Sequence, residues 1–534
     1  MLSALLLFLL PVYADWQYRS RSDLAPPQLN ITIFDHDKAS TDYLFVAPFS
    51  GFPDNTLHGP RQAAPYIFSA EGDLVWSGYS IFSIWNANFQ AAKFNGQDIL
   101  FSFEGDHNPA YGHGHGHHTF LNNRYELVKE LRAGKHKLSD KHEFHIKDEK
   151  TGLLQVYQPV PRDLSEFGAS EEQQWIVNAI FQELDLETGE VLFEWASLDH
   201  VSPHESVLPI NPGYAGSGYN SSDAWDYFHI NSVDKDENGD YLLSARDAAS
   251  VYKIDGKTGE VIWKLGGIPG ETSSSFENVG GFRFGFQHHA RYLWTSEDGK
   301  KQIISFFDNS AHGTEDKHGH LVKINEVSSG KVVEVNTETW EAKLLKNYQA
   351  PYGLLAKSQG SAQVLESGNV LVNWGSEGAV TEYTADGEIV FHAFLESGEL
   401  ADKVENYRAF KYDWHGYPTE DVAVLSEITD DGETQIYVSW NGDTETKLWK
   451  FYAVKNGSKT YIGEAKRTGF ETKYKVAETH EAVYAEALDK SGRILASSEP
   501  AIAIQQVLPF KAVAAQPETL QPNFLNYFSW RQQI

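Results

Sequence analysis

One recurring pattern restricts the folds open to this chain more than any other feature of its sequence. It consists of an apolar strand, a turn that ends in glycine and an acidic residue, an aliphatic pair and an aromatic residue. Such turns suit two-stranded antiparallel hairpins, and hairpins repeated along a chain are typical of a β-propeller. The pattern occurs at residues 66–76, 184–195, 252–265 and 382–391, with a degenerate copy at 333–344.

A second pattern precedes several of these hairpins and places a histidine at the start of a strand. Its copies begin at Lys141, Phe228 and Phe286, and a fourth copy without histidine begins at Ser361. The innermost strands of a propeller converge on a central channel, so the histidines of different blades can meet there. We therefore expect three blades to bring together His142, His229 and either His288 or His289.

Helical periodicity is scarce, and the pattern changes after residue 420. Residues 436–454 read as two strands around an Asn-Gly turn, and residues 482–498 read as a closing hairpin. The sequence thus predicts an all-β chain, a six-bladed β-propeller followed by a fibronectin type III-like β-sandwich. The expected limits are 15–420 for the propeller, 421–505 for the sandwich and 506–534 for a C-terminal tail.

The first 14 residues predict a signal peptide and hence a secreted protein. An apolar run of nine residues is too short to span a bilayer, and small-residue cleavage chemistry at Ala14 precedes Asp15. No Lys or Arg precedes this apolar run, although signal peptides usually have one there. The alternative is that these residues form a buried N-terminal strand. No later stretch is long enough for a membrane helix. Three sequons would be glycosylated in a eukaryotic source: Asn30, Asn220 and Asn456.

The charge and cysteine content exclude several kinds of partner and chemistry. With 44 Lys and Arg against 74 Asp and Glu, the formal charge of −30 argues against nucleic acids and anionic membranes as partners. A local group of Arg and His can still bind a small anion. The absence of cysteine excludes disulfides, thiolate metal sites and cysteine nucleophiles. The sequence leaves the oligomeric state open.

His229 and Arg246 form the sharpest candidate site, because they lie at the start and the end of one expected hairpin. The guanidinium presents a planar donor fork suited to sulfate, phosphate or carboxylate, and an imidazole can act as nucleophile, acid or base. The alternative is a structural histidine beside a surface ion pair. Of the neighbours His288 and His289, only one can face the channel, since adjacent residues of a strand point to opposite faces. We choose His288.

The tract at 113–118, HGHGHH, resembles a metal-binding segment in composition. Without cysteine or ordered acidic partners, we interpret it as a glycine-rich loop whose histidines approach the channel, with His115 as the candidate. We therefore expect neither a metal nor another cofactor.

The segments FHINSV, LLSARD, FGFQHHARY and ISFFDNSAH, in this order, resemble the arylsulfotransferase family, specifically its fungal-type secreted members. The resemblance covers roughly residues 40–500. Bacterial members are six-bladed propellers with a ping-pong mechanism: a channel histidine takes a sulfuryl group from an aryl sulfate and passes it to a phenol. They also have a disulfide, which this chain cannot form, and an N-terminal rather than a C-terminal sandwich.

The resemblance implies specific roles for residues at matching motif positions. His288 resembles the nucleophile, His229 and Arg246 the residues that clasp the sulfuryl group, and His142 the remaining histidine. A small aromatic substrate, phenolic or aryl sulfate, would contact a wider set: His115, His289, Asn231, Trp225, Phe284 and Trp374. Two alternatives remain open, namely a propeller repurposed as a cyclase or isomerase of the pericyclase type in secondary metabolism, and a non-catalytic ligand-binding propeller.

Overall fold

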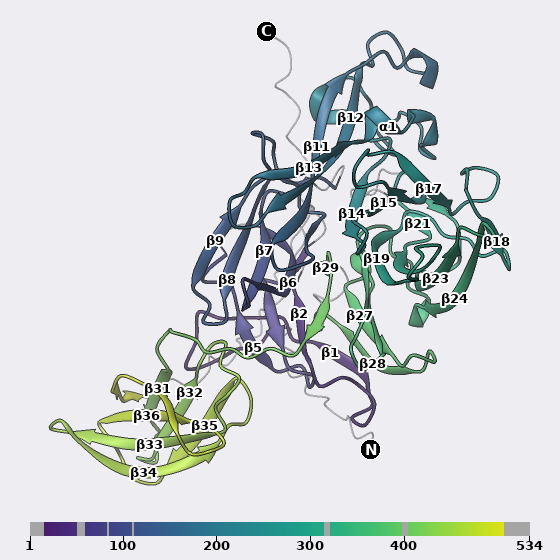
Figure 1. Ribbon diagram of the computed structural model, residues 1–534. Helices are drawn as coiled ribbons and strands as arrows, with labels where there is room; N and C mark the ends of the chain where they lie inside the picture. The colour runs from purple at the N-terminus through teal and green to yellow at the C-terminus, as the bar shows by residue number, and fades with distance from the viewer. Residues whose placement is uncertain are drawn as a thin grey trace, which may run out of the picture.

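A computed structural model describes residues 15–50, 59–82, 85–108, 112–313, 321–397 and 404–506 (Figure 1). The expected signal peptide and residues 507–534 of the expected tail lie outside this part. Within it, strands dominate, and α1 (Ser197–His200) is the one α-helix. No helix of the described residues is long and apolar enough to cross a membrane. Five short 3₁₀ turns lie at η1 (Ser165–Phe167), η2 (Pro203–Glu205), η3 (Ser221–Asp223), η4 (Pro351–Gly353) and η5 (Gly375–Glu377).

Six sheets of four or five strands follow one another through the described residues from 30 to 412, and we name them A to F. Sheet A has the order β30 (Phe410–Tyr412), β2 (Tyr43–Val46), β4 (Tyr66–Phe68), β5 (Leu74–Ser77). Sheet B has β6 (Asn86–Phe94), β7 (Gln97–Gly105), β8 (Gly116–Asn122), β9 (Leu127–Leu131). Sheet C has β10 (Phe144–Ile146), β11 (Thr151–Pro161), β12 (Trp175–Asp185), β13 (Val191–Ala196).

The other three sheets repeat this arrangement. Sheet D has β14 (Ile230–Lys235), β15 (Tyr241–Ala245), β16 (Ser250–Ile254), β17 (Val261–Gly266). Sheet E has β19 (His288–Thr295), β20 (Lys301–Asp308), β23 (Ser329–Asn336), β24 (Glu341–Gln349), β18 (Glu277–Val279). Sheet F has β25 (Ser361–Val364), β26 (Val370–Asn373), β27 (Ala379–Tyr383), β28 (Ile389–Phe394), β1 (Asn30–Phe34). Two ribbons add β3 (Pro48–Ser50) with β29 (Val404–Asn406), and β21 (Ala311–His312) with β22 (Val322–Lys323).

The five predicted hairpins are confirmed as antiparallel pairs. They are β4–β5, β12–β13, β16–β17, β23–β24 and β27–β28. In four of the turns the glycine adopts a positive φ, which a residue with a Cβ rarely tolerates; these are Gly72, Gly189, Gly259 and Gly387. The repeat therefore keeps glycine because the turn requires this backbone conformation.

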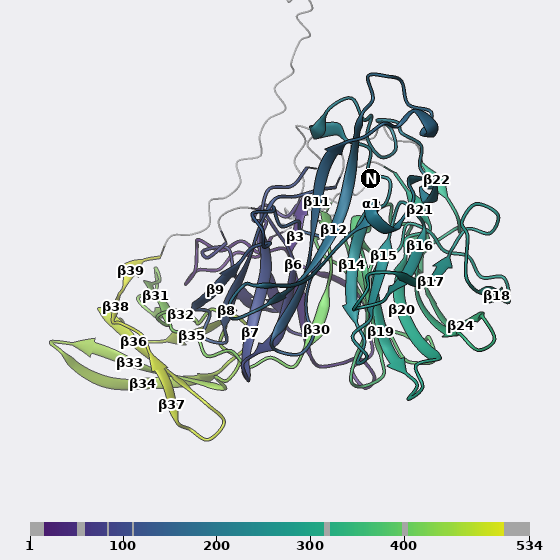
Figure 2. The same ribbon diagram turned by 45° about the horizontal axis from the view of Figure 1, so that its top comes forward.

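Apolar cores join each sheet to the next and sheet F back to sheet A, so the six sheets form a closed ring. The aromatic residue that ends a hairpin fills one of these cores: Trp195 packs between sheets C and D, Trp263 between D and E, and Phe391 between F and A. The two ends of the region close the ring, because β2 pairs with β30 and β1 pairs with β28. Figure 1 shows β1 beside β28, and Figure 2 shows the C-terminal strands β33, β34 and β36 to one side of the ring.

Residues 423–505 form two further sheets around one core that contains Trp440, Trp449 and Phe451. One sheet has β35 (Glu471–Val476), β32 (Thr434–Ser439), β31 (Ala423–Ile428), β39 (Ile504–Gln505). The other has β34 (Ser458–Lys466), β33 (Leu448–Lys455), β36 (Ala482–Leu488), β37 (Ile494–Ser497), with β38 (Ala501–Ile502) on β36.

The predicted closing hairpin of this C-terminal unit is confirmed as β36–β37. The strands expected around the Asn-Gly turn are present as β32 and β33, but they lie in different sheets and do not pair. The segment between them crosses from one sheet to the other. The N-terminal segment also contacts this unit, where Ser20 donates its backbone N–H to Glu471 at 2.6 Å.

Candidate histidine site

The three predicted histidines lie at the edge strands that face the ring axis. His142 precedes β10, His229 precedes β14, and His288 begins β19. The Nε2 atoms of His142 and His229 are 3.2 Å apart, and their rings are nearly perpendicular. The ring of Tyr407 lies 5.4 Å from that of His142 and 6.4 Å from that of His288. The fold thus gathers side chains from three sheets at one place.

Each histidine of the close pair is held by its own carboxylate. Nδ1 of His142 is 2.5 Å from Asp140, and Nδ1 of His229 is 2.6 Å from Asp226. The same carboxylates accept the backbone N–H of their histidines. Because Nδ1 donates to a carboxylate in both rings, the facing Nε2 atoms can hydrogen-bond only if one of them carries a proton. The 3.2 Å contact can therefore become a hydrogen bond when the pair binds one proton.

Burial and charge set the protonation of this pair. Burial lowers the pKa of His142 to about 3, against the opposing effect of Asp140. Burial by itself would raise the pKa of Asp140 and Asp226, but their histidine partners hold it well below the usual range of a carboxyl group. Both carboxylates are therefore ionised behind the pair, and the imidazole of His142 is neutral near pH 7.

His288 is held differently, by uncharged oxygens. Its Nδ1 lies 2.7 Å from the amide oxygen of Asn309 and 3.1 Å from the backbone oxygen of Phe286. The Asn309 amide is oriented by donating to the carbonyls of Ala356 and Gln359. Since both neighbours of Nδ1 are acceptors, Nδ1 carries the proton and Nε2 has the lone pair. Burial, followed by the charge of Arg246, lowers the pKa of His288, so its imidazole is neutral.

Arg246 lies beside His229, whose backbone carbonyl accepts its backbone N–H at 2.9 Å. The side chain is buried, and it donates to Asp247 at 2.8 Å and to the carbonyl of Lys357 at 3.0 Å. Burial raises the pKa of Asp247 despite this contact. Arg246 is therefore a buried cation near the cluster, not the member of a surface ion pair.

Two predicted substrate contacts are engaged inside the fold instead. Asn231 donates its side-chain N–H to the backbone carbonyl of Gln287 at 2.7 Å, and its backbone carbonyl accepts from Arg408 at 2.7 Å. His289 contacts the carbonyl of Ala362 at 3.1 Å, and burial, followed by the charge of Arg291, lowers its pKa. The charges that act on His289 differ from those that act on His288, as expected for neighbouring residues of a strand.

The three aromatic residues predicted to stack on an aryl ring lie in the cores between sheets. Trp225, Phe284 and Trp374 are almost completely buried and belong to the cores between sheets C and D, D and E, and E and F. Large apolar side chains gain most by filling the space between sheets, whereas the starts of the inner strands carry polar residues.

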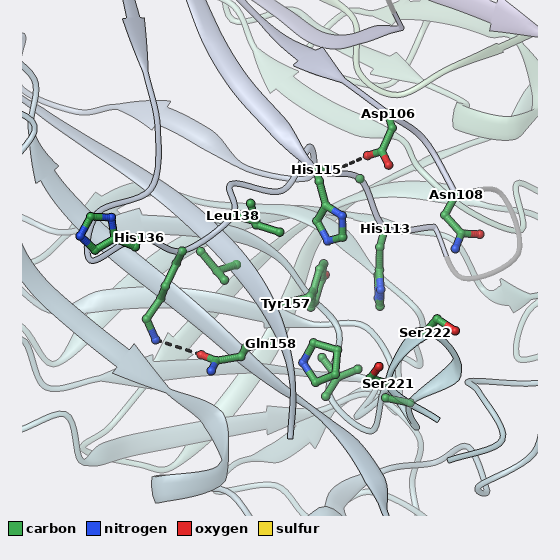
Figure 3. Close-up of a pocket in the computed structure, with 16 residues that line it drawn as sticks. Asp106, Asn108, His113, His115, His136, Leu138, Tyr157, Gln158, Ser221 and Ser222 are labelled. Carbon is green, nitrogen blue, oxygen red and sulfur yellow. Dashed lines mark hydrogen bonds between the residues drawn. The ribbon is translucent and has the colours of Figure 1, made fainter. Parts of the chain in front are cut away.

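The histidine-rich tract reaches the site through His113 and not through His115. Nε2 of His113 lies 2.8 Å from Asp226, and its ring stacks on Tyr157 at 4.2 Å. His115 donates its backbone N–H to Asp106 and lines a neighbouring cavity of about 400 Å³ (Figure 3). Among the described residues, one group has the donor atoms for a cation, namely His113, Asp226 and His229, but these atoms are already engaged with one another.

Some important residues escaped the sequence analysis although a local signal existed. Asp140 and Asp226 precede their histidines by two and three residues, so D-x-H and D-x-x-H are visible in the sequence. Asn309 has no such signal, because it lies 21 residues after the histidine that it orients.

Comparison with known proteins gives a family but no near relative. A family model described as Arylsulfotransferase (ASST) matches residues 90–396. No curated protein matches the chain.

The solved structures that resemble the chain are distant. A protein of unknown function from Bacteroides caccae has 10% identity and a TM-score of 0.37, over 69% of this chain and 98% of that one. Hydrazine synthase from Kuenenia stuttgartiensis has 13% identity and a TM-score of 0.29, over 66% and 80%. Virginiamycin B lyase from Staphylococcus aureus has 10% identity and a TM-score of 0.26, over 74% and 90%. Similarities this low decide neither fold nor function.

The family match stands on a firmer basis. It spans more than half of the 534 residues and includes His142, His229, Arg246 and His288. The chain therefore belongs to the arylsulfotransferase (ASST) family.

Proposed function

We propose that this protein is a secreted enzyme that moves a sulfuryl group from an aryl sulfate to a phenol. Its six sheets would be the blades of a β-propeller within residues 15–420, and residues 421–505 a fibronectin type III-like sandwich. The closed ring of shared cores supports the first assignment, and the two sheets around one core support the second. Residues 1–14 would direct secretion.

The observation that carries the proposed chemistry is the protonation of His288. Asn309 and the carbonyl of Phe286 hold the proton on Nδ1, so Nε2 keeps a lone pair on a neutral imidazole. A nucleophile of this kind can form a covalent intermediate without first losing a proton. Neither a metal nor a nucleotide is required for this step.

In the first half-reaction, Nε2 of His288 attacks the sulfur of the aryl sulfate. The N–S bond forms, the S–O bond to the aryl group breaks, and the aryl oxide takes a proton bound by the pair of His142 and His229. Arg246 would stabilise the charge on the sulfuryl oxygens as a hydrogen-bond donor.

In the second half-reaction, the phenolic acceptor attacks the sulfur of the sulfohistidine. The new O–S bond forms as the N–S bond breaks, and the acceptor proton returns to the histidine pair. Proton and charge therefore balance over the two steps.

One observation favours a second candidate, a cyclase or isomerase. The two Asp–His pairs, whose Nε2 atoms face each other at 3.2 Å, constitute an acid–base unit, and this unit could act on a reactive aromatic intermediate without His288.

Rapid mixing with 4-nitrophenyl sulfate separates these candidates. Without an acceptor, we expect a burst of one nitrophenol per enzyme and a protein mass increased by one sulfuryl group. Addition of phenol should then give steady turnover. A wild-type enzyme with no burst and no mass increase would exclude sulfuryl transfer through His288, and a chain that converts no aromatic substrate would fit a binding protein.

A further inference from the structure

A cavity of about 400 Å³ lies beside the histidine cluster, between the loops of sheets B and C. Its walls come from the tract around His113, the segment around Leu138, the end of β11 and the turn at Ser221 and Ser222 (Figure 3). Binding sites for small molecules are typically concave, mostly apolar and about 300–1,000 Å³ in volume, with a few polar groups that orient the ligand. This cavity fits that description.

The inner wall of the cavity also borders the histidine pair. Tyr157 lines the cavity, and its ring lies 5.3 Å from that of His229 and 5.5 Å from that of His142. His113 stacks on Tyr157 and bonds to Asp226, the carboxylate that holds His229. A ligand in the cavity would thus lie against residues that contact the pair directly.

His113 provides a polar anchor in this wall. Asp226 accepts hydrogen bonds from two imidazoles, His229 and His113, and the His113 side chain keeps 18% of its surface exposed. Burial alone would lower the pKa of His113, but Asp226 and, more weakly, Asp140 outweigh burial and the charge of Lys141, so the pKa is raised. A partly protonated imidazole attracts an anionic or acidic oxygen.

The rim of the cavity carries an apolar side chain that nothing in the described residues covers. Leu138 is 58% exposed and lines the cavity together with His115 (Figure 3). The lining also includes two buried aliphatic residues, Val156 and Val177, and the exposed Pro159. A flat apolar ligand would cover Leu138 as it entered.

We propose that this lateral cavity binds the aromatic part of the substrate, a ring with an acidic or anionic oxygen, with His113 as its anchor and Leu138 as the residue that limits ring size. The proposal rests on the proposed function for the identity of the substrate class. In this proposal the aryl ring contacts the wall of the cavity. It does not contact Trp225, Phe284 and Trp374, which lie in the cores between sheets.

Substitutions that make the side chain at Leu138 smaller or larger test the proposal without any sulfuryl transfer. Calorimetric titration with 4-nitrophenol and with 2-naphthol, in the absence of a sulfate donor, gives the ratio of their affinities. Leu138→Ala should shift this ratio toward 2-naphthol and Leu138→Trp toward 4-nitrophenol, each by about 5-fold or more, since small volume changes in apolar pockets have effects of this size. Leu345→Trp, on the outer part of sheet E, is the surface control and should leave the ratio unchanged.

The anchor has its own test. His113→Gln keeps a hydrogen-bond donor but removes the positive charge, and it should weaken binding of 4-nitrophenol about 10-fold. His115→Gln, in the same cavity, is the matched control and should have less than half of that effect.

The proposal is overturned if neither phenol binds the wild-type protein, if both Leu138 variants keep the wild-type ratio, or if His113→Gln binds as tightly as wild type. These results are distinguishable from failure of the proposed function. If the affinity ratio changes in the Leu138 variants but the wild-type protein gives no nitrophenol burst, the cavity is supported and sulfuryl transfer is rejected. If the burst occurs but the ratio does not change, sulfuryl transfer is supported and the cavity is rejected.

Discussion

The two halves of the histidine cluster differ in the atoms that hold their imidazoles. His142 and His229 donate Nδ1–H to carboxylates, whereas His288 donates Nδ1–H to an amide and a backbone carbonyl. A carboxylate stabilises a charged imidazolium, while a neutral acceptor fixes the tautomer and leaves the ring uncharged. One half is therefore suited to hold and release a proton, and the other to offer a lone pair.

This difference arises from ordinary local structure. Asp140 and Asp226 lie in the segments that lead into their own strands, so the acid and its histidine come from one piece of chain. Asn309 follows β20 and reaches the start of β19 across the sheet. The carboxylates of His142 and His229 are thus close to them in the sequence, whereas the amide that contacts His288 is brought there by tertiary structure.

The largest effect is expected from removing the nucleophile. His288→Ala should reduce nitrophenol release from 4-nitrophenyl sulfate by about 10⁴-fold or more, because covalent transfer has no other attacking group. Initial rates together with a thermal unfolding curve will distinguish lost chemistry from lost folding. Activity retained in a folded variant would reject the division of roles between the two halves.

A smaller effect is expected on the carboxylate side. Asp226→Asn should lower the rate with phenyl sulfate by about 10²–10³-fold, since proton transfer from a positioned group contributes on this scale. With 4-nitrophenyl sulfate the loss should be much smaller, because its leaving group departs readily as an anion.

Single-turnover release of the two phenols measures this contrast. Equal losses for both donors would mean that Asp226 maintains the structure and not the proton supply.

Replacing the amide that accepts from Nδ1 of His288 by a carboxylate should change the pH profile of the activity. Asn309→Asp places a carboxylate 2.7 Å from Nδ1 of His288 and should raise its pKa by roughly 1–3 units. Because the wild-type pKa of His288 lies well below 6.5, protonation should remove the lone pair at a higher pH in the variant than in wild type. As the pH is lowered, the activity of the variant should therefore begin to fall at a higher pH than that of wild type, which the two pH–rate profiles measure. Parallel profiles would show that Asn309 does not control the protonation of His288.

The smallest effect concerns stability. The pKa of His288 is lowered in the folded protein, so below about pH 6.5 the unfolded chain binds more protons at this residue. Its contribution to folding is complete above that pH and is lost as the pH falls. Between pH 7 and pH 5, His288→Gln should therefore lose roughly 2 kcal/mol less stability than wild type. Denaturant unfolding at both pH values measures this, and equal losses would contradict it.

The local features of the site were predictable from the sequence, and the composition of its surroundings was not. Hairpins with glycine turns were found because their chemistry lies within about a dozen residues, and the positions of His142, His229 and His288 followed from their place before such strands. The place of Trp225 in a core between sheets was not predictable, because a tryptophan in the sequence does not reveal whether it faces the axis or a neighbouring sheet. His113 was passed over for His115 in a tract where four of six residues are histidine.

The sequence by itself determined the all-β class, the hairpin repeat and the family, because turns and strand alternation act over short distances along the chain. Only the tertiary structure decided that β2 pairs with β30, that Asn309 orients His288, and that Asp226 serves two histidines at once. These contacts join residues from 3 to nearly 370 positions apart. The physical reason is that the ring closes by burying apolar faces between sheets, and the polar starts of the inner strands then meet at the axis whatever their separation in sequence.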